Sequence, residues 1–109
     1  MEIIKNTNYK AFLNLSCYLK YNHTLISLDI KSSKIDSKTL LKLGKCFEKN
    51  KNLVYLNLID NNLDYQTIIK FGLLIRKNNI INDIKMLLNK PSFDEQLRIK
   101  RCNPHIIFN

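Results

Sequence analysis

The sequence predicts an α/β solenoid in which about three strand-and-helix units stack, with parallel strands on a concave face and helices on a convex face. One observation is a period of 28 residues at which apolar residues recur in phase, as Leu28, Leu56 and Ile84 show. A second is the alternation of Leu56 and Leu58, which is typical of a strand with one buried face. The third is the helical spacing of the apolar residues between the strands.

A helix is expected ahead of the first strand, from about Tyr9 to Tyr21, where it would cover one end of the stack. Two further helices follow the first two strands, and their inward faces repeat with the same offset: Leu40, Leu41, Leu43 and Phe47, then Ile68, Ile69, Phe71 and Ile75. Ser37 and Asp64 occupy the positions where the N-caps of these two helices are expected.

Small and polar residues also recur in phase in and near the helices. Asn22, Asn50 and Asn78 each precede a repeat leucine or isoleucine by three positions, and asparagine can close a helix in the left-handed conformation. Gly44 and Gly72 lie within the helices, where glycine is unfavourable by up to about 1 kcal/mol relative to alanine. We therefore expect a neighbouring helix or strand to approach both glycines closely.

The second unit carries a family resemblance. Residues 50–63, NKNLVYLNLIDNNL, meet nearly the whole pattern L-x-x-L-x-L-x-x-N-x-L. The chain therefore resembles the long leucine-rich repeats of the ribonuclease-inhibitor type, which also occur in tropomodulin-like proteins and innate-immune receptors. The likeness covers roughly residues 9 to 91. It implies a short leucine-rich-repeat solenoid that binds protein partners and has no catalytic activity.

The resemblance also implies a role for one asparagine. In such repeats the asparagine of the pattern, here Asn61, bonds backbone groups of the turn that follows the strand. The third unit has Asn89 at the same phase, whereas the first has Ser33, which can replace these hydrogen bonds only in part. An asparagine ladder of this kind would be weakest in the first unit.

The 28-residue period ends near residue 91. Ser92 and Glu95 form a capping-box pattern ahead of residues 96–102, which predicts a short closing helix that ends before Pro104. The alternative is a degenerate strand, although it would begin too soon after the third strand to complete another unit. Its pattern positions would be Leu97, Ile99 and Cys102.

We interpret residues 1–109 as one domain, with a capping helix in residues 1–22, repeats in residues 23–91, and a cap and tail in residues 92–109. The tail from His105 to Phe108 is apolar enough to pack on the last repeat or on a partner. With only a short helix and this tail at the end of the stack, the strand edge from Ile84 to Leu87 is expected to be incompletely protected.

In a solenoid of this kind, the side chains between the strand leucines point out of the concave face. In register they form three columns: Ser27, Tyr55 and Asp83; Asp29, Asn57 and Lys85; Lys31, Ile59 and Leu87. We interpret these columns as a candidate protein-binding surface, with Tyr55 as an amphipathic anchor and with Ile59 and Leu87 as an exposed apolar pair. The alternative, that these are ordinary solvated positions, stays open.

The formal charge of +9 suggests an anionic partner, although 15 of the 18 basic residues are lysine, a bias consistent with an A/T-rich genome. Basic residues share a phase on successive helices and would form stripes on the convex side: Lys42, Lys70 and Arg98; Lys49 and Lys77. Such stripes could follow a phosphate backbone. Charged residues are also usual on the solvent face of a helix, so both interpretations stay open.

The sequence offers no pattern for catalysis or for a cofactor. His23 and His105 occupy expected surface positions, and the three cysteines lack the spacing of a zinc site or a disulfide framework. There is no glycine-rich phosphate loop. No segment reaches the roughly 20 apolar residues that a membrane span requires. We therefore expect a non-enzymatic protein without a cofactor, metal, membrane span or small-molecule substrate.

The leading hypothesis for function is a small adaptor or accessory subunit, which docks onto a larger assembly through its concave strands or its C-terminal end. The alternative is a basic RNA- or ribonucleoprotein-associated protein, which contacts phosphates through helix-side lysines. A third possibility is a remnant of a longer repeat protein that has no partner. The odd number of widely spaced cysteines favours an intracellular location, cytoplasmic or nuclear.

Overall fold

The computed structural model describes residues 2–3, 14, 18–61, 63–78, 80–86 and 91–107. Within them five parallel strands form one sheet, in which the strands follow one another in chain order. The strands are β1 (Glu2–Ile3), β2 (Ser27–Asp29), β3 (Tyr55–Asn57), β4 (Asp83–Lys85) and β5 (Ile106–Ile107). The connections after β2, β3 and β4 contain the helices α2 (Ser37–Lys49), α3 (Tyr65–Ile75) and α4 (Phe93–Cys102).

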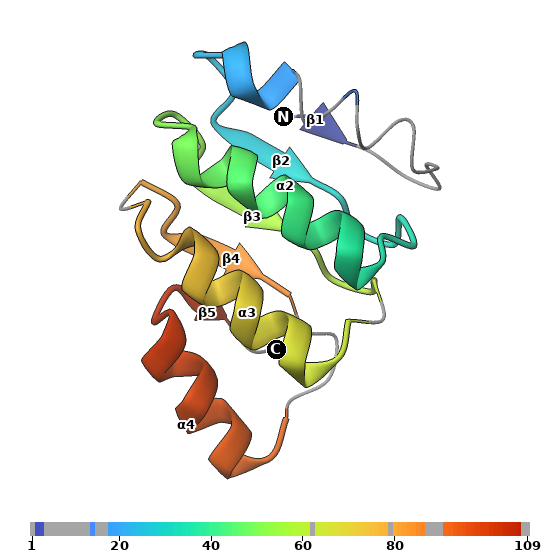
Figure 1. Ribbon diagram of the computed structural model, residues 1–109, viewed down its shortest axis with the longest axis vertical. Helices are drawn as coiled ribbons and strands as arrows, with labels where there is room; N and C mark the ends of the chain where they lie inside the picture. Colours follow the sequence, from blue (N-terminus) through green and yellow to red (C-terminus); the bar gives the residue numbers. More distant parts are fainter. Residues whose placement is uncertain are drawn as a thin grey trace.

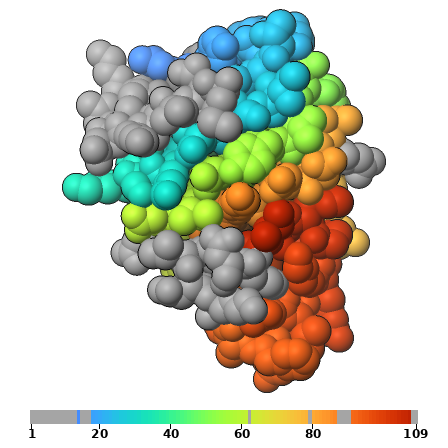
Figure 2. Space-filling model, turned by 180° about the vertical axis from the view of Figure 1, so that it is seen from behind, coloured from blue at the N-terminus to red at the C-terminus, as the bar shows by residue number. Residues whose placement is uncertain are grey.

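The helices cover one face of the sheet and run side by side, so the molecule has two layers (Figure 1). One helix lies in each of these connections because parallel neighbouring strands require a crossover. Seen from the opposite side, successive repeats form adjacent bands from the N-terminal to the C-terminal end (Figure 2). The predicted arrangement, with strands on one side and helices on the other, is therefore confirmed.

The strands pair with the 28-residue offset of the sequence. Leu28 of β2 lies beside Leu56 of β3, which lies beside Ile84 of β4. The prediction of adjacent strands that run in the same direction is therefore confirmed. β4 and β5 are related by a shorter offset, because Ile84 pairs with Ile106, which is 22 positions later.

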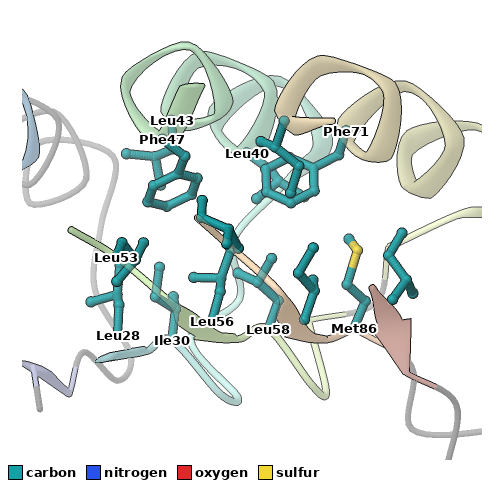
Figure 3. Packing of buried hydrophobic residues seen from close by; sticks show 14 of the residues in the cluster. Leu28, Ile30, Leu40, Leu43, Phe47, Leu53, Leu56, Leu58, Phe71 and Met86 are labelled. Atoms are coloured by element: carbon teal, nitrogen blue, oxygen red, sulfur yellow. The ribbon is translucent and has the colours of Figure 1, made fainter. Parts of the chain in front are cut away.

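The hydrophobic core lies between the sheet and the helices (Figure 3). Leu56 from the sheet is fully buried and points toward the helices, as does its equivalent Leu28 in the first unit (Figure 3). Phe47 of α2 meets Phe71 of α3 edge to face, with the ring centroids 6.0 Å apart and the planes at 90°. This geometry adds about 0.5–1.5 kcal/mol to the free energy gained by removing the two rings from water.

The first two of these helices begin at an aspartate that caps the first turn. Asp36 accepts a hydrogen bond from the backbone N–H of Thr39, and Asp64 accepts one from Thr67, both at 2.8 Å. The prediction of Asp64 as an N-cap is confirmed. The prediction of Ser37 as an N-cap is wrong, since Ser37 is the first residue of α2 and the N-cap is Asp36, which is in phase with Asp64. The hydrogen bonds from Thr39 and Thr67 hold the pKa of each aspartate below its usual value.

The helix ends do not use left-handed backbone at asparagine. Asn50 closes α2 with φ −77° and ψ 125°, which is an extended conformation, and α3 closes at Arg76 in the helical region. Positive φ angles occur instead in the turns that follow the strands, at Ser32, Lys34 and Asp60. The predicted backbone conformation at the helix ends is therefore wrong, since the asparagines act there through their side chains.

Asparagine side chains join neighbouring repeats at the helix ends. Asn50 Nδ2 donates to the backbone carbonyl of Leu19 at 3.1 Å, and Asn78 Nδ2 donates to that of Phe47 at 2.6 Å. In both cases the acceptor lies 31 residues earlier, at the end of the preceding helical segment. Asn50 Oδ1 also accepts from the N–H of Leu53 at 2.8 Å, so one side chain fixes the end of one repeat and the start of the next.

The asparagine of the repeat pattern, Asn61, is buried and bridges two turns. Its Nδ2 donates to the backbone carbonyl oxygens of Ile30 at 2.8 Å and of Leu58 at 2.9 Å, which follow β2 and β3. This confirms that the asparagine bonds backbone groups of the turn after the strand. Ser33 has the same phase in the first unit, and Asn89, its counterpart in the third, lies outside the described residues.

Both glycines within the helices lie against a neighbouring element, as predicted. A Cβ atom at Gly44 would lie 2.5 Å from Leu74 Cδ2 of α3. A Cβ atom at Gly72 would lie 3.2 Å from Ile106 Cδ1 of β5. The absence of a side chain at these two positions therefore lets the neighbouring elements approach this closely.

The C-terminal segment adds a helix and a strand to the stack. Ser92 and Glu95 form the predicted capping box at the start of α4, so the alternative of a strand in residues 97–102 is wrong. Asn103 follows the helix, and its Nδ2 donates to the backbone carbonyl of Gly72 at 3.2 Å. The tail then packs on the last repeat as β5, so β4 is not an edge strand and the predicted exposure of its edge is also wrong.

The sheet also begins earlier than predicted. β1 pairs with β2, although residues 2–3 carry no copy of the repeat pattern. The capping helix expected from Tyr9 to Tyr21 lies largely outside the described residues, of which 14 and 18–21 are helical.

Candidate functional site

The concave face carries the strand side chains that point away from the helices. Pairing across β2, β3 and β4 places these side chains in two rows: Ser27, Tyr55 and Asp83; Asp29, Asn57 and Lys85. Both rows are as predicted, because paired residues in a sheet share one face.

Tyr55 is the aromatic residue of these two rows. It lies half-buried on β3, the middle strand, directly beside Asp83 of β4. Lys85 Nζ lies 5.7 Å from the centroid of the Tyr55 ring, within the range of a cation–π attraction. Lys85 is two positions beyond Asp83, and this diagonal placement lets a long side chain reach across neighbouring strands. The ring and the ammonium group are therefore held together on one surface.

Asp83 places a hydrogen-bond acceptor without a donor beside this ring. Its Oδ1 is buried, and no donor among the described residues reaches it. Leaving a buried polar oxygen unpaired is unfavourable by about 1–3 kcal/mol. Asp83 as a whole is half-buried, so its carboxylate lies beside Tyr55 at the edge of this face.

Asp29 and Asn57 stabilise the turns that follow their strands. Asp29 Oδ1 accepts from the backbone N–H of Lys31 at 2.8 Å, and Asn57 Oδ1 accepts from that of Ile59 at 3.1 Å. Such contacts between residues two apart close a tight turn. Asn57 is only 8% exposed, so its side chain offers little surface to a partner, whereas Asp29 is half-buried and Lys31 is exposed.

Ile59 does not belong to the exposed surface either. It is 8% exposed, so its prediction as one of an exposed apolar pair is wrong. The reason is that β3 ends at Asn57 and the chain turns at Asp60, where φ is 63°, so strand alternation no longer applies to Ile59. Leu87, the other predicted member of the pair, lies outside the described residues.

β5 extends the concave face beyond the sequence prediction. Ile107 pairs with Lys85, and the carbonyl of His105 accepts from the N–H of Ile84 at 3.1 Å. Sequence reasoning missed this extension because the offset to β5 is 22 rather than 28 positions. The available signal is Asn103, which precedes an apolar residue by three positions, as the asparagines of the earlier units do.

The predicted basic stripes lie on the helical layer and not on the concave face. Their members are exposed at equivalent positions of successive helices or just beyond them: Lys42, Lys70 and Arg98; Lys49 and Lys77. The shared phase of each stripe is therefore preserved in three dimensions.

A hollow of about 550 Å³ lies where the turns after β2 and β3 meet the start of α2. Its lining consists of Ser32, Lys34, Ile35, Asp36, Asp60 and Asn61. Its polar groups already bond within the fold, because Ser32 Oγ donates to Asp60 Oδ2 at 2.7 Å and Asp36 caps α2. We therefore assign this hollow to the turns and not to a ligand.

The described residues hold no group of three His, Cys, Asp or Glu side chains that could bind a metal, and Cys46 and Cys102 are free thiols. His23 is exposed in the turn before β2, as predicted. No helix in this part of the chain is long and apolar enough to cross a bilayer.

Comparison with known proteins identifies the fold. No family model matches the chain, and a search of curated proteins finds no match. Among solved structures, leiomodin-1 actin-binding site 2 is similar with a TM-score of 0.81, over 100% of this chain and 70% of that chain, at 13% sequence identity. The fold is a leucine-rich-repeat solenoid. At this level of identity the likeness shows the leucine-rich-repeat architecture alone, which confirms the predicted fold class.

Proposed function

We propose that this leucine-rich-repeat chain is a non-catalytic protein–protein interaction module, an adaptor or accessory subunit that docks onto a larger assembly through its concave face. The observation that carries the proposal is the cluster of Tyr55, Asp83 and Lys85 on neighbouring strands. The cluster combines a half-buried ring, a half-buried carboxylate, and an ammonium group held over the ring. It offers a partner an apolar contact together with hydrogen-bonding groups of both charges.

The scaffold under this cluster supports the proposal. Tyr55 and Asp83 pair in register, and the next residues, Leu56 and Ile84, are fully buried beneath them in the core. A surface that is formed before binding loses little conformational entropy when a partner arrives. The concave face is therefore suited to docking without a large rearrangement.

The chemistry of the cluster limits the partner. A complementary protein surface would present a donor to Asp83, an acceptor to Lys85 and an apolar side chain to Tyr55. The similar solved structure is named as an actin-binding site, which supports a protein partner for this fold in general terms.

Affinity purification of the tagged chain from its native cells, with and without nuclease, tests the proposal. The wild type is compared with a Tyr55→Arg/Asp83→Arg variant and with Tyr21→Arg, a control at a tyrosine that is 71% exposed and lies before β2. We expect nuclease-resistant protein partners that the concave-face variant loses by about tenfold or more and the control retains. Undiminished recovery of every partner by the concave-face variant would contradict the proposal.

A second candidate function is association with RNA or a ribonucleoprotein, because Lys42, Lys70 and Arg98 are exposed at equivalent positions of consecutive helices. This function requires association that nuclease abolishes and that falls steeply between about 50 and 200 mM salt, as counterions are released from phosphates. A flat salt response would exclude it and leave the adaptor function.

A further inference from the structure

A groove of about 400 Å³ lies between α3 and α4 on the surface of the helical layer. It is lined by residues of both helices: Tyr65, Gln66 and Ile69 of α3, and Arg98, Arg101 and Cys102 of α4. None of these residues belongs to the strands of the concave face, so the groove is a separate surface.

Two arginines line the α4 side of this groove. Arg98 and Arg101 are three positions apart, so their side chains leave the helix on the same side. The chain has 18 basic residues, and only Arg76, Arg98 and Arg101 are arginine. Two of the few arginines of a lysine-rich chain therefore meet at one groove. A planar guanidinium can bind a carboxylate through two parallel hydrogen bonds, which an ammonium group cannot do.

The guanidinium groups of Arg98 and Arg101 are both exposed, and neither forms an ion pair with an acidic side chain of the described residues. The acid nearest to Arg98 in sequence on this helix, Glu95, has its Oε1 bonded by the backbone N–H of Ser92 at 3.1 Å and by the Ser92 hydroxyl at 3.0 Å. Asp94, four positions before Arg98 on the same helix, forms no ion pair with it either, so neither guanidinium is paired with a carboxylate of the described residues. A carboxylate from outside the chain is the complementary group.

The α3 side of the groove is largely apolar. Tyr65 and Ile69 are four positions apart, and both are half-buried against the edge of the core. Leu73, four positions after Ile69 on α3, is 47% exposed and extends this apolar side by one turn of the helix. A strip of apolar side chains beside a pair of cations complements an amphipathic segment that carries acidic residues along one edge.

We propose that this groove binds a short, acidic, amphipathic segment of a partner protein. Its carboxylates pair with Arg98 and Arg101, and its apolar side chains lie on Tyr65 and Ile69. A peptide fits better than RNA, because a phosphate backbone would pair with the arginines but leave the apolar strip without an apolar contact. The proposal does not rest on the function of the concave face.

Selection from a displayed library of random peptides about 12 residues long tests the proposal on the whole chain. The targets are the wild type, an Arg98→Gln/Arg101→Gln variant, and a Lys49→Gln/Lys77→Gln control that removes the same charge from exposed positions outside the groove. Unfolding curves establish that all three proteins are folded. We expect the wild type to enrich peptides that combine acidic with apolar residues. Synthetic copies should bind the arginine variant about tenfold more weakly, and the control within about twofold of the wild type.

A Gln66→Glu variant gives a second measurement that does not remove either arginine. It places a competing carboxylate on the rim of the groove, so the enriched peptides should bind it more weakly than the wild type. Failure to enrich acidic peptides, or equal binding of such peptides to the arginine variant and the lysine control, would overturn the proposal. A labelled uridine oligonucleotide that binds more tightly than the peptides and depends on the same arginines would assign the groove to RNA, and would overturn it as well.

Discussion

The side-chain oxygen of Asn61 accepts a hydrogen bond from the backbone N–H of Ser33, 28 residues earlier, at 2.9 Å. The same oxygen accepts from the N–H of Ile35 at 3.2 Å. One amide therefore satisfies backbone groups of a turn that belongs to the preceding repeat. This explains why serine suffices at position 33, since that turn receives its hydrogen bonds from the second unit.

Replacing Asn61 with alanine is expected to lower the free energy of unfolding by about 2–4 kcal/mol, because several buried backbone groups lose their partners at once. Urea denaturation measures the change. Asn82→Ala is the control, since Asn82 is exposed, and its effect should stay within about 0.5 kcal/mol. Equal stability of the two variants would show that the Asn61 ladder does not hold the repeats together.

Replacing Ile106 with alanine tests whether β5 belongs to the sheet. Ile106 is fully buried, so the cavity left by the substitution should lower the free energy of unfolding by about 2–4 kcal/mol. Ile107→Ala, at the half-buried neighbouring position, should have less than about half that effect. If both variants unfold at the urea concentration of the wild type, the C-terminal segment is not a strand of this fold.

Replacing Gly44 tests the close approach of α2 and α3. Gly44→Leu should lower the free energy of unfolding by about 2 kcal/mol or more, because even a Cβ atom would lie 2.5 Å from Leu74 Cδ2. Gly44→Ala should be within about 1 kcal/mol of the wild type, since the Leu74 methyl can turn away and alanine favours the helix. Thermal unfolding of both variants provides the comparison, and a leucine variant as stable as the wild type would contradict this packing.

Acid should weaken the starts of α2 and α3. The pKa values of Asp36 and Asp64 are lowered from 3.8, so their stabilising contribution is present above about pH 4 and is lost as the pH falls through the native values. An Asp36→Asn/Asp64→Asn variant keeps both capping acceptors but removes the titration. Its free energy of unfolding should therefore change less than that of the wild type between about pH 5 and pH 2. Parallel pH profiles from urea denaturation would contradict the role of these caps.

Sequence reasoning predicted the register of the central strands because every unit of a stacked repeat buries the same positions. The phase of Leu28, Leu56 and Ile84 was enough to place Tyr55 and Asp83 side by side on the concave face. The prediction extended the alternation too far at Ile59, since a pattern of period two holds only while the backbone stays extended and β3 ends two residues earlier.

The C-terminal end could not be predicted from the period. The chain reaches β5 through a shorter connection, so Ile106 pairs with Ile84 after 22 positions rather than 28. The groove between α3 and α4 depends on the same packing. The 28-residue phase was enough to predict Arg98 as part of a basic stripe. It could not predict that Arg98 and Arg101 line the same groove as Ile69, because this depends on how the two helices pack.

Scalar couplings across hydrogen bonds, measured by NMR on the isotopically labelled chain, test the stacking of the repeats most directly. The backbone N–H of Ile30 donates to the carbonyl of Asn57 at 2.8 Å, and the N–H of Leu58 donates to the carbonyl of Lys85 at 2.6 Å. We expect a coupling between the nitrogen and the carbonyl carbon of each of these pairs. Couplings that join Ile30 or Leu58 to any other carbonyl would contradict the parallel 28-residue register, and with it both proposed binding surfaces.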